Sequence, residues 1–141
     1  MGKHLATVLL AALVLGGCTS VKQTFPDRDA GRVWNAMVVA AEQPRYHGWT
    51  LRDNRVMVDD AGRRIEIDRR IERTLHPPEA EPEAQKQHWR FTVRLVKTEP
   101  PTAKFIIRTV ALPVDVRAEA RRYYDEVLAL LQGRRMSTPD E

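Results

Sequence analysis

The most reactive side chain in this sequence belongs to Cys18, the only cysteine among 141 residues. It follows an uncharged run from Leu5 to Leu15 and two glycines, and Lys3 precedes that run. A basic start, a short apolar core and a small-residue cleavage site are the three parts of a secretory signal. The run is too short to span a bilayer, which takes about 20 apolar residues. The order therefore predicts a secretory signal with its small-residue cleavage site at Gly16 and Gly17.

The four residues Leu15-Gly16-Gly17-Cys18 resemble the lipobox of bacterial lipoproteins, in which a large aliphatic and two small residues precede the cysteine. The resemblance covers residues 1–18 only. It implies a diacylglycerol on the Cys18 thiol, cleavage of the signal over residues 1–17 between Gly17 and Cys18, and a further acyl chain, such as palmitate, on the new amino terminus. Several chains are needed because one alone anchors only marginally. Thr19 in place of an aspartate implies the outer membrane, facing the periplasm, if the source is Gram-negative. The alternative is an ordinary cleaved signal with a cysteine nearby.

No set of residues with catalytic spacing is found elsewhere. The serines beyond the predicted signal, Ser20 and Ser137, lie in expected terminal segments. The pair Asp59-Asp60 could suggest acid–base chemistry, but its place before Gly62 favours a turn. With Cys18 acylated, a disulfide and a Cys/His metal site are excluded. We therefore expect a protein that is not an enzyme and uses no cofactor.

A metal site is the one alternative among the histidines. His76 and His88 flank a stretch rich in proline and acid, and would approach each other if that stretch closed a hairpin. With the carboxylates of Glu79, Glu81 or Glu83 they would supply metal-binding atoms. Their spacing matches no ligand pattern, so a solvated hairpin is the favoured interpretation and no metal is expected.

Arg69 and Arg73 are the candidate ligand contacts. Residues 63–75 alternate strictly between polar and apolar positions, which predicts a strand with one solvated face. Both arginines fall on the apolar face, beside Ile67 and Ile71. They could lie beyond the helix layer with their charged heads in water, or a bulge could shift the register. The functional alternative is the basic end of an apolar groove, suited to a lipid phosphate or a partner's carboxylate.

The elements that position these residues follow from periodicity and turn chemistry. The first is a helix over 28–43, capped by Asp27. Short strands follow at 49–51 and 56–58, with a turn at Asp53-Asn54 between them, and then the strand at 63–75 and a loop over 76–87. Two more strands, at 89–95 and 104–111, are joined by a turn at Pro100-Pro101, and a helix over 116–132 lies between its N-cap Asp115 and Gly133. The core is expected to include Trp34, Trp49 and Trp89, and the doublets Arg121-Arg122 and Arg134-Arg135 are expected to be solvated. The fold class is α+β, a two-layer sandwich of four or five antiparallel strands with both helices on one face. This order is similar to that of small helix-grip modules in envelope accessory lipoproteins.

The predicted organisation is a signal at 1–17, a lipidated linker at 18–26, a single domain at 27–135 and a flexible tail at 136–141. Without the signal the chain loses only Lys3 among its charged residues and stays mildly basic. Export makes nucleic acid an improbable partner. The expected function is an outer-membrane-anchored interaction module, bound to the membrane through Cys18 and to an envelope protein partner. The alternative is a small lipid- or ligand-binding domain with Arg69 and Arg73 at the mouth of a cavity between helices and sheet.

Overall fold

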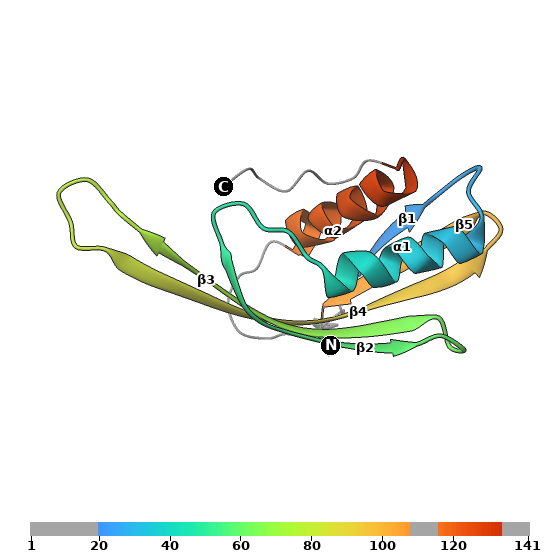
Figure 1. Cartoon of the computed structure of the whole chain (residues 1–141), viewed down its shortest axis with the longest axis horizontal. Helices are drawn as coiled ribbons and strands as arrows, with labels where there is room; N and C mark the ends of the chain where they lie inside the picture. The colour runs from blue at the N-terminus through green and yellow to red at the C-terminus, as the bar shows by residue number, and fades with distance from the viewer. Residues whose placement is uncertain (1–19, 108–115, 134–141) are drawn as a thin grey trace, which may run out of the picture.

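The computed structural model describes residues 20–107 and 116–133. These residues form a five-stranded antiparallel sheet in the order β1-β5-β4-β3-β2. The strands are β1 (Ser20–Thr24), β2 (Thr50–Asp59), β3 (Arg64–Leu75), β4 (Glu83–Thr98) and β5 (Pro101–Ile107), and the helices are α1 (Ala30–Glu42) and α2 (Val116–Leu131). Both helices lie on the same face of the sheet (Figure 1). The predicted α+β class is confirmed.

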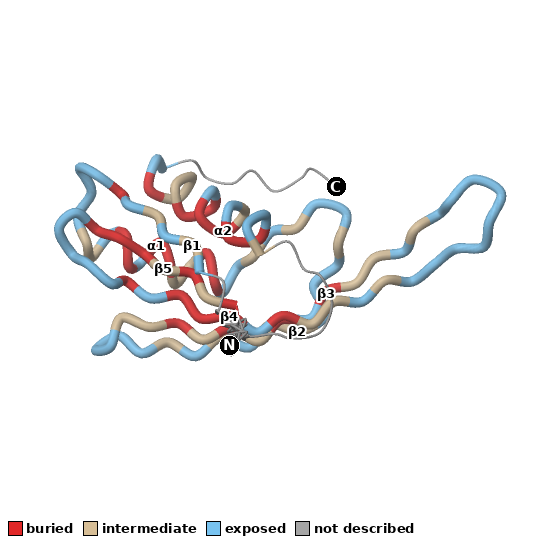
Figure 2. The backbone as a smooth tube through the Cα atoms, turned by 180° about the vertical axis from the view of Figure 1, so that it is seen from behind, coloured by how far each residue is buried: buried red, intermediate tan, exposed pale blue. Residues whose placement is uncertain are grey.

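The core lies between the two helices and the inner face of the sheet. Its sheet side is the set of alternating apolar residues on β3, β4 and β5, such as Ile65, Val93 and Phe105, all fully buried. Its helix side includes Trp34 from α1 and Tyr123 from α2. Figure 2 shows this burial concentrated where the helices cover the sheet. The opposite face of the sheet carries no helix among the described elements, and most of its side chains are at least partly exposed.

The start of α1 and the end of α2 each have a local chemical cause. The Asp29 carboxylate accepts a hydrogen bond from the Arg32 N–H at 3.0 Å and caps α1. The predicted cap, Asp27, is wrong, since Asp27 lies two residues earlier with a positive φ of 58°. The end of α2 agrees with the prediction: Gly133 follows it with φ +69°, a conformation that glycine adopts at little cost.

Residues 20–25 overturn the predicted linker. They form β1, which pairs with β5 from Ser20↔Ile106 to Thr24↔Thr102, and Phe25 is only 1% exposed. The stretch looked like a linker because β1 is a short edge strand with polar residues at four of its five positions. Its stability comes from backbone pairing and from Phe25, which lies 6.2 Å from Tyr124 between ring centroids.

Three other boundaries differ from the prediction. Asp53-Asn54 is no turn: β2 runs through it, with a register irregularity between Leu51 and Asp53 that absorbs one extra residue. The predicted loop at 76–87 is shorter, because residues 83–87 already pair with β3. The fifth strand begins at Pro101 rather than at residue 104. By contrast, Asp59 does form the predicted turn, since its side chain accepts from the Gly62 N–H at 2.9 Å.

Candidate interaction surface

Arg69 is fully buried, with 0% of its surface exposed. Its Nε donates to Asn54 Oδ1 at 2.8 Å, one Nη to the Tyr46 hydroxyl at 2.9 Å and the other to the Ala41 carbonyl oxygen at 2.8 Å. The prediction that its head lies in water is therefore wrong. The contact with an anionic ligand stays a prediction, but in this structure the chain's own acceptors bind all three nitrogens of Arg69.

Arg69 belongs to a buried charge cluster that consists of Tyr46, Arg69, Glu119, Arg122 and Glu126. Glu119 Oε1 accepts from the Tyr46 hydroxyl and from Arg122 Nη2, both at 2.7 Å, and lies 3.8 Å from Arg69 Nη1. Arg122 also pairs with Glu126, and its guanidinium lies 4.1 Å from the centre of the Tyr46 ring. Arg122 is thus a bridging residue and not the solvated one that the Arg121-Arg122 doublet predicted.

Burial and neighbouring charges shift the pKa of three members of the cluster, Tyr46, Arg122 and Glu126. Burial and then the nearby Glu119 raise the pKa of Tyr46 well above its usual value. Burial opposes the charge on Arg122, but the hydrogen bonds and charge of Glu119 raise the pKa of Arg122 overall. Burial also raises the pKa of Glu126, which Arg122 partly counteracts. Through its hydrogen bonds the cluster joins three segments, namely β3, the connection after α1, and α2.

Arg73 reaches the surface that Arg69 does not. Its guanidinium lies 4.2 Å from the centre of the Trp49 ring, and its Nε donates to Gln85 Oε1 at 2.7 Å. Trp49 is partly buried beneath it, whereas Trp34 and Trp89 are core residues as predicted. Arg73 and Arg69 point to the same face, but Arg69 is fully buried whereas Arg73, which contacts Trp49 in the connection after α1, stays partly exposed.

Beyond Arg73 the β3–β4 hairpin continues as a two-stranded arm, residues 73–85. β2 ends its pairing with β3 at Thr50↔Glu72, so the arm's strands pair only with each other. The arm projects away from the helices (Figure 1), and its turn is exposed (Figure 2). Its tip carries the three exposed carboxylates Glu79, Glu81 and Glu83. An isolated two-stranded hairpin is marginally stable, and the arm has no third strand or helix packed on it among the described elements.

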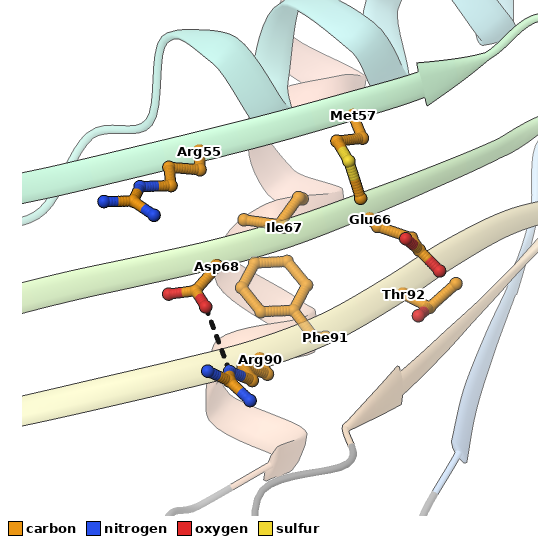
Figure 3. Close-up of a pocket in the computed structure, with 8 residues that line it drawn as sticks. All are labelled: Arg55, Met57, Glu66, Ile67, Asp68, Arg90, Phe91 and Thr92. Atoms are coloured by element: carbon orange, nitrogen blue, oxygen red, sulfur yellow. Dashed lines mark hydrogen bonds and ion pairs between the residues drawn. The ribbon is translucent and has the colours of Figure 1, made fainter.

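The outer face of the sheet holds an open groove of about 500 Å³ across β2, β3 and β4. Arg55, Met57, Glu66, Asp68, Arg90 and Thr92 line it from the outer side, as Figure 3 shows. Met57 is 64% exposed. Burial opposes the charge on Asp68, but hydrogen bonds from His88 at 2.6 Å and Arg90 at 2.9 Å hold the pKa of that carboxyl below its usual value. The groove is a mixed polar and apolar surface with a fixed ion pair along one side.

Beyond the groove, the part of the outer face on β5, β1 and residues 89–98 of β4 carries basic residues and no acidic ones. Arg94, Lys104 and Lys22 are directly paired across β4, β5 and β1, and we call these three the basic row. Their strand neighbours Val93 and Phe105 are fully buried on the inner face, so the basic row points to the outer one. Among the described residues, none makes a hydrogen bond or ion pair with a side chain of the basic row.

The predicted metal ligands are not brought together. His88 pairs with Asp68, on the outer face, while His76 lies at the exposed end of the arm. Within residues 20–107 and 116–133, no three histidine, cysteine, aspartate or glutamate side chains are placed to hold one ion. Asp59 and Asp60 each accept a hydrogen bond at the β2–β3 turn, Asp60 from Trp34 Nε1 at 2.8 Å.

Sequence reasoning missed most of the charge cluster, although one signal for it was present. Glu119, Arg122 and Glu126 are spaced three and four residues apart, which places them on one side of α2. The apolar stripe of α2 lies next to that side. Its position could have predicted that these three charged residues form a buried polar patch. Tyr46 carried no such signal, because its position depends on the connection that follows α1.

Several of the predictions fall on residues that the structure does not describe: Gly17, Cys18, Asp115, Arg134-Arg135 and the tail at 136–141. No described helix is both long and apolar enough to cross a membrane. No protein-family model, curated protein or solved structure matches this chain.

Proposed function

We propose that this chain is a lipid-anchored, non-enzymatic interaction module of the bacterial cell envelope. The lipobox-like residues 15–18 support the anchor. The uncovered outer face of the sheet and the projecting arm support the interaction role, because a small domain without partners gains nothing evident from extending a marginal hairpin into solvent. The partner proposed is an envelope protein, and the membrane proposed is the outer membrane.

The interaction role rests on one contrast: the donors of the buried Arg69 are satisfied by the chain itself, whereas the described helices leave the outer face of the sheet and the arm tip uncovered. In the interior, Arg69 donates hydrogen bonds to Asn54, Tyr46 and the Ala41 carbonyl oxygen. The outer face instead presents the basic row, an open groove and an acidic arm tip, none of which a described helix covers. A cavity between helices and sheet, with Arg69 at its mouth, does not fit this arrangement, so the ligand-binding alternative is not favoured.

Lipidation is tested by fatty-acid labelling of the wild type and of Cys18→Ser in cells. A serine hydroxyl is a far poorer nucleophile than a thiolate, so we expect label in the wild type only. Cys18→Ser should accumulate as an unprocessed precursor or as a form released from the membrane. Equal labelling of both chains would refute the anchor.

The interaction role is tested by photo-crosslinking from a reactive amino acid at Ala80, in the exposed turn of the arm. The matched control places the same amino acid at Asn35, which is exposed on α1. We expect a discrete crosslinked envelope protein from Ala80 and none from Asn35. Failure to crosslink from Ala80, and then from Met57 in the groove, would contradict a role in which the outer face or the arm binds a partner.

A further inference from the structure

The basic row lies in a region of the sheet that has no acidic residue. β1, β5 and residues 89–98 of β4 contain no aspartate or glutamate. Arg94 therefore faces Lys104, and Lys104 faces Lys22, with no carboxylate beside them in these strands. Like charges directly opposite each other on neighbouring strands are destabilising. An arrangement of this kind is relieved by an anionic surface placed against it.

The proposed anchor is close to this row. β1 begins at Ser20, two residues after Cys18. Two residues span at most about 7 Å of extended chain, so a lipid on Cys18 would hold the start of β1 at the membrane surface. Lys22, the first member of the row, is the second outer-face residue of β1 after Ser20. The edge of the sheet that bears the row is thus the edge nearest the bilayer.

The tip of the arm is acidic and lies at the other end of β3 from the basic row. Arg94 pairs with Arg64 at the start of β3, whereas the acidic tip follows Leu75 at its end. At about 3.3 Å per residue, β3 separates the two by roughly 35 Å. An anionic surface would attract the row and repel the three glutamates of the tip. Both forces favour the same orientation, with the arm directed away from the surface.

We infer that the basic row binds the anionic phospholipid headgroups of the membrane that holds the Cys18 anchor. The outer face of β1, β5 and β4 then lies against the bilayer at the basic row, and the acidic tip of the arm, at the other end of β3, is held away from that contact for a partner. This inference rests on the proposed lipid anchor for its membrane, but the affinity of the row for anionic lipid does not depend on acylation. The two can therefore be tested apart.

The test uses a chain that starts at Ser20, which retains every described strand and helix and lacks the anchor. Its partitioning is measured onto vesicles of phosphatidylcholine alone and of phosphatidylcholine mixed with phosphatidylglycerol, at low and at high salt. The row variant is Lys22→Gln/Arg94→Gln/Lys104→Gln. The matched control, Arg52→Gln/Arg55→Gln/Arg70→Gln, removes the same charge from the same face, where Glu72 and Asp53 already pair with Arg52 and Arg55.

A basic residue at an anionic leaflet is worth about fivefold in binding, so losing three should weaken partitioning roughly a hundredfold. We expect that loss for the row variant, a loss below about tenfold for the control, and loss of wild-type binding at high salt. Equal partitioning of the wild type onto both vesicles would overturn the inference, as would equal losses for the two variants. Circular dichroism of both variants shows whether they fold. Fatty-acid labelling at Cys18 decides the anchor separately, whichever result the vesicles give.

Discussion

Replacing Glu119 with glutamine should be among the most destabilising conservative changes in this protein. Glu119 is 5% exposed and is the nearest carboxylate to Arg69, which is fully buried. Glu119→Gln keeps the shape of the side chain but removes the charge that balances a guanidinium with no access to water. Leaving one member of a buried ion pair without its partner costs about 3–5 kcal/mol. Loss of the charge-assisted hydrogen bonds from Arg122 acts in the same direction.

The double variant Arg69→Met/Glu119→Gln separates the charge from the packing. Arg69→Met alone leaves Asn54 Oδ1 without its donor, and an unsatisfied buried polar atom costs about 1–3 kcal/mol. With both charges gone there is no uncompensated guanidinium from Arg69. The double variant should therefore lose less stability than the sum of the two single changes, with a coupling of at least about 1 kcal/mol.

Urea unfolding at neutral pH, followed by tryptophan fluorescence, measures these free energies because Trp34 and Trp89 are buried. Asp53→Asn is the control, since its pair with Arg55 is exposed and should contribute about 0–1 kcal/mol. If Glu119→Gln cost no more than Asp53→Asn, Arg69 would not depend on Glu119 for its charge balance. Strict additivity in the double variant would refute the coupling even if both single changes were costly.

Three further changes test separate features. Since burial raises the pKa of Glu126 in the folded state, the folded chain binds a proton there more tightly; Glu126→Gln should therefore gain stability relative to the wild type as pH rises from its unfolded pKa, in unfolding titrations across pH. Gly133→Ala should lose about 1–2 kcal/mol, seen as a lower Tm, because alanine is strained at φ +69°; Gly31→Ala, at negative φ, should lose less. Tyr123→Phe should lose about 0.5–1.5 kcal/mol in urea unfolding, since the hydroxyl donates to the buried Met37 carbonyl oxygen at 2.8 Å.

The parts of the fold that sequence predicts well are those governed by one face of one element. Strict alternation in β3 predicted which side chains point inward, and it put Arg69 and Ile67 on the same face correctly. Alternation says nothing about what covers each position. Arg69 is buried because α1 ends above it and presents the Ala41 carbonyl oxygen, a contact between residues 28 apart. That acceptor could be found only once the helix was placed on the sheet.

Edge strands show the opposite limit. β1 has little apolar periodicity, because an edge strand buries few side chains and its pairing uses the backbone. The backbone is the same in every sequence, so a short polar strand and a polar linker look alike. Phe25 was the available sign, as a large aromatic residue in a polar stretch seeks a core. Its neighbour Pro26 favoured the interpretation of a linker end instead.

The place of β1 also changes what the proposed anchor does. A flexible linker would let the domain take any orientation above the bilayer, and charges on its surface would then act only through their average. β1 pairs with β5 from Ser20 onward, so a lipid on Cys18 would be joined to an edge of the sheet by a very short stretch of chain. A rigid attachment restricts which face can meet the membrane, so a few cations near that edge are enough to select one orientation.

Lengthening the chain between Cys18 and Ser20 with a flexible insert should therefore preserve fatty-acid labelling while it weakens crosslinking from Ala80, because the arm would no longer be held in a fixed direction. Unchanged crosslinking after such an insertion would show that the orientation does not depend on the short attachment.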